Sequence, residues 1–166
     1  MTVREIRPLI ELQQVLKDPL ATGPNPAYWV FDNLDMERWV NLTILVAGKF
    51  GVEYNKTFGH YHADGKDEVY HLISGVGLLL LQSEDEFKII KATAGDEITI
   101  AKKYIHCWVN IGAEPLISYD DHRDPKDNYE TVAAKHGLAY YIIEENGQPK
   151  AVPNPNYEHV PEPVWS

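Results

Sequence analysis

The chain has 166 residues, of which 44% are hydrophobic and 24% charged, values typical of one soluble globular domain with an ordinary core. Its formal net charge of -10 argues against nucleic-acid binding as the main function, because Lys and Arg must neutralise a phosphate backbone. The single cysteine, Cys107, excludes an internal disulfide, and no apolar run approaches membrane-spanning length. We therefore expect a cytoplasmic protein with neither a signal peptide nor a membrane partner.

The first 25 residues are expected to form a helix and a loop. Residues 7–18 carry apolar side chains at helical spacing and are followed by Pro19, which predicts a short amphipathic helix. Residues 20–27 contain two prolines and a glycine, which is typical of a loop.

Residues 26–150 are expected to form an all-β barrel or sandwich, because short β-branched segments alternate with polar or glycine-bearing turns. Within this span, residues 75–77 predict a tight hairpin, and residues 128–137 predict one short helix with its glycine just past the end. Residues 151–166 are rich in proline and predict an extended arm that packs on the barrel or on a partner subunit, or is mobile. Together these segments make one domain over residues 1–166.

Three histidines and a glutamate carry the strongest chemical signal. His60 and His62 are two residues apart, so on a strand their side chains share one face. Glu68 follows after the polar connection ADGKD, which predicts a turn, and His106 lies in a later β-rich segment. Three imidazoles and a carboxylate that converge inside a small barrel would hold a divalent transition metal with coordination positions left open.

A histidine pair at this spacing is, on its own, more often surface decoration or satisfied core. The frame around it is more specific. Gly75 follows Glu68 after six residues, Gly95 precedes His106, and Asn110 follows His106 after three residues. This two-part pattern resembles the signature of the cupin family, which implies a double-stranded β-helix (jelly-roll) barrel. The chain departs from the signature at Ala101 and Lys103, and in the longer spacing before Glu68.

Four further segments extend the resemblance from about Pro26 to about Pro155. KTFGHYH, EVYHLISGVGLLLLQ, HCWVNIGAEP and IIEENG, in this order, resemble the cupin-type glucose-6-phosphate isomerases. The resemblance implies a small metal-dependent homodimer that acts on a small phosphorylated sugar. It also implies one divalent transition metal per subunit, with Fe(II) first and Mn(II), Ni(II) or Zn(II) as alternatives.

The resemblance also implies roles for individual residues. Glu68 and Tyr70 become the catalytic candidates, and Tyr70 shares the face of Glu68 on a regular strand. The alternative interpretation of Thr43 is an ordinary strand residue without a functional role, and that of Tyr70 is an aromatic residue of the core. The implied metal ligands are His60, His62, Glu68 and His106, and the implied substrate contacts are Thr43, Thr57, Gly59, Tyr129, His122 and Tyr28.

The segment DDHRDPKDN, residues 120–128, departs from the family. His122 stands where a tyrosine is expected, and Asp127 or Asn128 stands where a histidine is expected. An aspartate near a substrate phosphate would be unfavourable, so Arg123 or Lys126 would have to supply the positive charge.

The implied reaction is the interconversion of glucose 6-phosphate and fructose 6-phosphate. Hydrogen moves between C1 and C2 either by proton transfer through a cis-enediol, with Glu68 as the base, or by a hydride shift. The alternatives are another metal-dependent cupin enzyme, such as a sugar isomerase or an oxygenase, or a sugar-phosphate-binding cupin without turnover.

Overall fold

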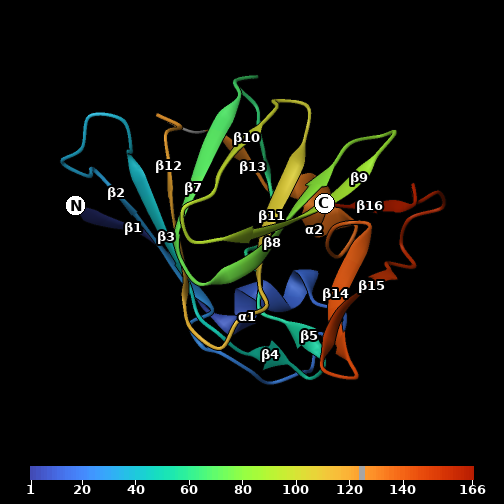
Figure 1. Ribbon diagram of the computed structural model, residues 1–166. Coiled ribbons are helices and arrows are strands. Elements are labelled where there is room, and N and C mark those ends of the chain that lie inside the picture. Colours follow the sequence, from blue (N-terminus) through green and yellow to red (C-terminus); the bar gives the residue numbers. More distant parts are fainter. Residues whose placement is uncertain (124–125) are drawn as a thin grey trace.

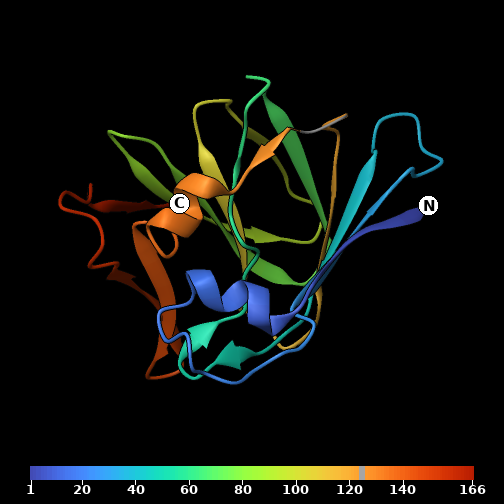
Figure 2. The ribbon, with the colours of Figure 1, turned by 180° about the vertical axis from the view of Figure 1, so that it is seen from behind.

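The computed structural model describes residues 1–123 and 126–166. Two β-sheets face each other and enclose the core (Figures 1 and 2). The larger sheet has six strands in the order β1 (Thr2–Arg7), β2 (Tyr28–Asp32), β3 (Asn41–Leu45), β12 (Leu116–Asp120), β7 (Glu68–Ser74) and β10 (Glu97–Ile100). The smaller has four, in the order β11 (Ile105–Asn110), β8 (Val76–Gln82), β9 (Phe87–Thr93) and β16 (Pro163–Trp165).

Shorter elements close the ends and sides of this sandwich. A second four-stranded sheet contains β15 (Gln148–Pro153), β14 (Tyr140–Glu145), β5 (Glu53–Tyr54) and β4 (Lys49–Phe50), and β13 (Asp127–Asn128) pairs with β6 (Tyr61–His62). The helical elements are α1 (Leu9–Leu12), the 3-10 turn Gln13–Val15, and α2 (Glu130–Ala134). No helix within residues 1–123 or 126–166 is both long enough and apolar enough to cross a membrane. The predicted all-β cupin fold with short peripheral helices is confirmed.

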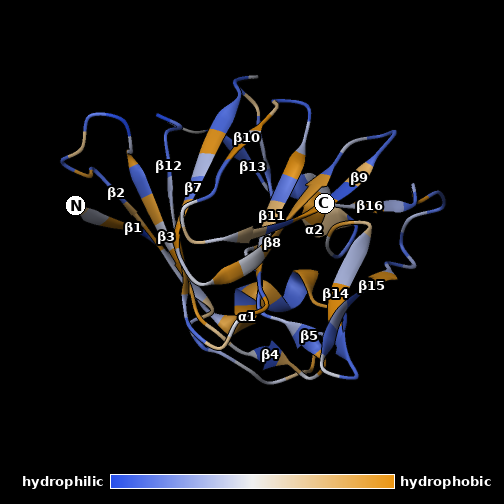
Figure 3. Cartoon of the chain, viewed as in Figure 1, coloured by the Kyte–Doolittle hydropathy of each residue, from blue (hydrophilic) through white to orange (hydrophobic). Residues whose placement is uncertain are grey.

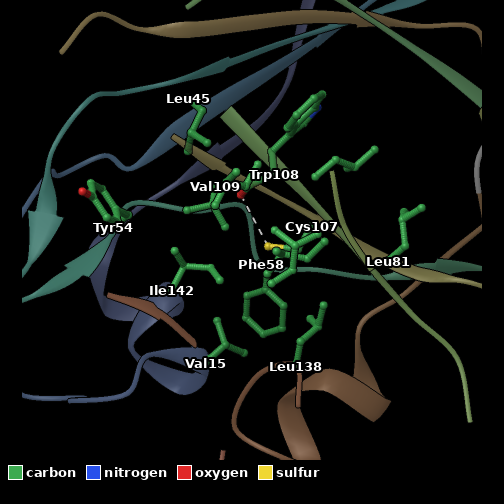
Figure 4. Packing of buried hydrophobic residues seen from close by; sticks show 14 of the residues in the cluster. Val15, Leu45, Tyr54, Phe58, Leu81, Cys107, Trp108, Val109, Leu138 and Ile142 are labelled. Atoms are coloured by element: carbon green, nitrogen blue, oxygen red, sulfur yellow. Dashed lines mark hydrogen bonds between the residues drawn. The ribbon is translucent and has the colours of Figure 1, made fainter. Parts of the chain in front are cut away.

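The core lies between the sheets and under the peripheral elements. Residues 78–81 of β8 are all leucine and all at most 3% exposed. Because neighbouring strand residues point to opposite faces, both faces of β8 are covered, which explains its uninterrupted apolar run. On one side Phe58 lies among Val15, Leu138 and Cys107 (Figure 4). Hydrophobic residues concentrate on the strands, whereas the connecting loops are mainly hydrophilic (Figure 3).

The predicted hairpin at residues 75–77 is a corner instead. β7 and β8 belong to different sheets and do not pair with each other. Gly75 has φ +87°, and a Cβ there would lie 2.8 Å from the carbonyl oxygen of Pro115. Glycine therefore lets the chain cross from one sheet to the other at this point.

The N-terminal segment is partly a strand, so the prediction of helix and loop for residues 1–25 is wrong for its first part. β1 pairs antiparallel with β2 and forms the edge of the large sheet. The predicted helix over 7–18 shrinks to α1 and the 3-10 turn that follows it. A strand this short and polar shows little alternation of apolar and polar side chains, so the sequence does not predict it. Its pairing with β2 stabilises the strand conformation.

In the C-terminal third, the predicted helix over 128–137 shortens to α2, and residues 151–153 of the predicted arm belong to β15. α2 ends before Gly137, whose amide donates to the carbonyl oxygen of Val132 at 2.9 Å. The terminal arm packs on the barrel, because β16 pairs in parallel with β9. Backbone hydrogen bonds between Ser166 and both Ile89 and Lys91 hold its last residue.

A buried ion pair ties the N-terminal segment to the barrel. Lys56 Nζ lies 2.7 Å from Glu53 Oε1, and both side chains are at most 6% exposed. Lys56 Nζ also donates to the carbonyl oxygen of Val15 at 2.6 Å, and Glu53 Oε2 accepts from the amide of Lys17 at 2.7 Å. The pair thus satisfies backbone groups at the C-terminal end of the 3-10 turn and just beyond it.

We predict that Glu53→Gln lowers the free energy of unfolding by about 3–5 kcal/mol, because it leaves the Lys56 ammonium buried and unpaired. Urea unfolding followed by fluorescence measures the change. Glu145→Gln is the control, because Glu145 pairs with Lys150 at the surface and such a pair contributes at most about 1 kcal/mol. Equal effects of the two substitutions would contradict the structural role of the buried pair.

Candidate metal centre

Two neighbouring chain segments bring the histidines together. The segment that carries His60 runs antiparallel to β11, and His60 forms a β-bridge with His106. The amide of each donates to the carbonyl of the other, at 3.2 Å from His60 and 2.9 Å from His106. His62 follows in β6, and the short turn after it contains Gly65 at φ +66°. Glu68 then opens β7 on the facing sheet, and the structure thereby places all four residues close together.

The carboxylate of Glu68 lies between two imidazoles. Its Oε2 is 2.8 Å from His62 Nε2 and 3.2 Å from His106 Nε2. The ring of His60 is centred 4.9 Å from that of His62 and 4.4 Å from that of His106. His62, Glu68 and His106 are all buried.

This arrangement fits a divalent transition metal. Potential ligand atoms of His60, His62 and His106 lie within 4.8 Å of one another. His106 Nε2 is buried, and among residues 1–123 and 126–166 its contact with Glu68 Oε2 at 3.2 Å does not have hydrogen-bond geometry, which is unusual for a buried polar atom. A set of imidazoles with one carboxylate is a donor set that Fe, Mn, Ni and Zn accept. We conclude that the residues can hold such an ion.

His122 lies beside this cluster. Its ring stacks on that of His62 with centroids 3.8 Å apart, and His62, Glu68 and His122 form a second group with ligand atoms within 4.8 Å. However, His122 Nε2 lies 3.0 Å from Asp64 Oδ2 and is held by that carboxylate. We therefore do not assign His122 as a metal ligand.

The protonation of the cluster follows from burial and mutual contacts. Burial alone would raise the pKa of Glu68, but the contacts with His106 and His62 hold this pKa well below its usual range. Burial, with a smaller effect of His106, lowers the pKa of His60 to about 3. Burial would also lower the pKa of His62, but Asp127 and Glu68 raise it to about 9. The cluster therefore holds an ionised carboxylate and a neutral His60.

Outer contacts orient two of the imidazoles. Asp127 Oδ1 lies 3.0 Å from His62 Nδ1, and the carbonyl oxygen of Tyr104 lies 3.5 Å from His106 Nδ1. Such partners fix the tautomer and rotation of a ligating histidine. The resemblance to the family implied that Asp127 lies near the pocket. No sequence pattern indicated its contact with His62.

The implied substrate contacts mostly surround the same chamber. Tyr70 on β7 lines it, as predicted from strand alternation, and so does Thr43 on β3, which the family resemblance implied. Gly59 does not line it; its φ is +88°, and a Cβ there would lie 2.8 Å from Leu138 Cδ1. His122 lines a neighbouring cavity instead. The predicted residues in the chamber lining are Tyr28, Thr43, Thr57, His60, His62, Glu68, Tyr70 and Tyr129.

Several lining hydroxyls already have protein partners. Thr57 Oγ1 accepts from the amide of Trp108 at 3.0 Å. The hydroxyl of Tyr28 accepts from Arg7 Nε at 3.1 Å and from the amide of Phe58 at 3.3 Å. These bonds fix the positions of the two hydroxyl oxygens.

The structure adds residues that the sequence analysis did not assign. Asn41, Trp108 and Asp120 line the chamber, and so do Arg4 and Glu5 of β1. Burial and the charge of Glu68 raise the pKa of Asp120 to about 8. The positions of all these residues depend on the register of the sheet, and sheet register does not appear as a motif in the sequence.

Part of the segment 120–128 lies outside the described residues, namely Asp124 and Pro125. The supply of positive charge by Arg123 or Lys126 stays a prediction; Arg123 is exposed and donates to the carbonyl oxygen of Glu37 at 2.9 Å. Asp127 lies against His62 and within 3.4 Å of Arg4 Nη2.

Residues 7–160 match the family model described as glucose-6-phosphate isomerase. The chain belongs to this family. A glucose-6-phosphate isomerase of Pyrococcus furiosus is 39% identical over 119 residues, which cover 70% of this chain and 62% of that protein. One from Thermococcus kodakarensis is 35% identical over 119 residues, with the same coverage of 70% and 62%. The matches thus span less than two thirds of these relatives.

A solved oxalate oxidase in complex with the substrate analogue glycolate is similar to this chain with a TM-score of 0.44 and 12% identity. The similarity covers 63% of this chain and 47% of that chain.

We predict that Asp127→Asn lowers the affinity for a divalent transition metal by about 10- to 100-fold, because His62 loses the carboxylate that orients it. A competition titration against a chromogenic chelator measures the affinity. The matched control is Asp64→Asn, because Asp64 is equally buried but contacts His122. An Asp127 variant that binds metal as tightly as the unmodified protein would contradict the assignment.

Proposed function

We propose that the chain is a metal-dependent aldose–ketose isomerase that interconverts glucose 6-phosphate and fructose 6-phosphate. The observation that carries this proposal is the Glu68 carboxylate between His62 and His106 in a chamber lined by hydroxyl groups. Membership of the glucose-6-phosphate isomerase family and the names of the relatives support the same reaction.

His60, His62, Glu68 and His106 would hold one divalent ion per subunit, with Fe(II) as the first candidate and Mn(II), Ni(II) or Zn(II) as alternatives. When bound, such an ion would polarise the sugar carbonyl and make the neighbouring C–H bond more acidic.

The reaction moves two hydrogens. From aldose to ketose, the hydrogen on C2 passes to C1, and the proton of the C2 hydroxyl passes to the oxygen on C1. Glu68 is the proposed base that takes the proton from C2 and returns it to C1, because it is the carboxylate of the histidine cluster in the chamber. Tyr70 lies two residues further along β7 in the chamber wall, where its hydroxyl can hold a sugar oxygen.

We further propose that the protein is a cytoplasmic homodimer with a small phosphorylated sugar as its ligand and without a nucleic-acid or membrane partner. The exposed side chains of Val3, Ile6 and Ile10 near the edge strand β1 support a contact between subunits. Light scattering of the purified protein measures its mass in solution, and a monomer at micromolar concentration would contradict the dimer.

The direct test is a coupled assay of fructose 6-phosphate conversion to glucose 6-phosphate. Chelator-stripped protein is assayed alone and after separate addition of Fe(II), Mn(II), Ni(II) and Zn(II). We expect no turnover without metal and restored turnover with at least one ion. Protein that binds a metal and fructose 6-phosphate but shows no turnover would instead be a binding module.

We predict that Glu68→Gln reduces kcat by at least about 100-fold beyond any loss of metal, because general-base catalysis typically contributes about 10²- to 10⁴-fold. The wild-type reaction in deuterated water should place solvent deuterium in the product, since the base exchanges its proton. Product without carbon-bound solvent deuterium at C2 would count against the enediol route and favour a hydride shift.

A further inference from the structure

Strand β1 contains a β-bulge that turns two consecutive side chains toward the site. Val3 pairs with Phe31, and Glu5 pairs with the preceding residue, Val30, so Arg4 is the extra residue. On a regular strand Arg4 and Glu5 would point to opposite faces. Both line the metal chamber here, as expected of a bulge that redirects a side chain beside a site.

The metal chamber alone is too small for a sugar phosphate. Its free volume is about 30 Å³, which is room for one water molecule or one ion. A second cavity of about 440 Å³ lies next to it, within the range of small-molecule sites. Arg4 and Asn41 line both spaces, so a ligand that reaches the metal ligands with one end would extend past Arg4 into the larger cavity.

Arg4 has donors to spare at this junction. Its side chain is 27% exposed, and its one side-chain hydrogen bond within residues 1–123 and 126–166 runs from Nη2 to Asp127 Oδ2, at 3.4 Å. By contrast, the guanidinium of Arg7 is held by Glu5, Glu11 and Tyr28. Since a guanidinium offers five N–H donors, most of those on Arg4 can turn to a ligand.

We infer that Arg4 binds the phosphate group of the substrate at the junction of the two cavities. The inference rests on the proposed function and names the residue that selects phosphorylated sugars. A guanidinium matches phosphate with paired hydrogen bonds, and it offsets the unfavourable charge of Asp127 at the same place. The sugar carbons then lie toward Glu68 and the phosphate toward the larger cavity.

The test compares Arg4→Gln and Arg4→Lys in the metal-loaded protein. Because a hydrogen bond to a charged group contributes about 1.5–3 kcal/mol, Arg4→Gln should raise KM for fructose 6-phosphate by about 10- to 100-fold. It should weaken binding of inorganic phosphate, measured by calorimetry, by a similar factor. The KM of Arg4→Lys should lie between those of the wild type and Arg4→Gln, because lysine keeps the positive charge but cannot form the paired hydrogen bonds of a guanidinium. The control is Arg38→Gln, because Arg38 forms an exposed pair with Glu97 away from both cavities.

Metal affinity and kcat distinguish a phosphate contact from an indirect role through Asp127. A phosphate contact leaves metal affinity unchanged and kcat within a few-fold. Arg4→Gln protein that binds phosphate as tightly as the wild type, or that loses metal instead of phosphate, would overturn the inference. A wild-type protein that binds phosphate through Arg4 but has no isomerase activity would overturn the proposed function alone.

Discussion

The contact of one carboxylate with two imidazoles across the sandwich determines the rest of the site. Glu68 comes from the six-stranded sheet, His106 from the four-stranded sheet, and His62 from the short strand between them. Each group is buried, so none is favourable without the others or without an ion between them. The backbone bridge of His60 with His106 fixes the register in which these side chains meet.

Around this contact, ionisable side chains form a continuous chain of contacts. Arg4 approaches Asp127, Asp127 contacts His62, and His62 contacts Glu68. Although the net charge of the protein is -10, the guanidinium of Arg4 thereby lies beside the buried carboxylate–imidazole cluster. This arrangement favours an anionic ligand whose other end must reach the carboxylate.

The sequence was sufficient for the parts of the site that depend on local geometry. Strand alternation and a short turn place His60, His62 and Glu68 together, and alternation from Glu68 also places Tyr70. The wall residues Arg4 and Asp120 depend instead on a bulge, on sheet register and on which strands are neighbours. These properties depend on contacts between distant parts of the chain, so they cannot be predicted from the spacing of residues in a single sequence. The corner at Gly75 was misinterpreted for the same reason, because a turn residue does not reveal which sheet the next strand joins.

The most direct measurement of the central claim is anomalous X-ray diffraction from crystals grown with Fe(II) or Mn(II), recorded on both sides of the metal absorption edge. The account predicts one anomalous peak per chain, in contact with His60, His62, Glu68 and His106. A peak on His62, Glu68 and His122 without His106, or no peak in the chamber, would contradict it.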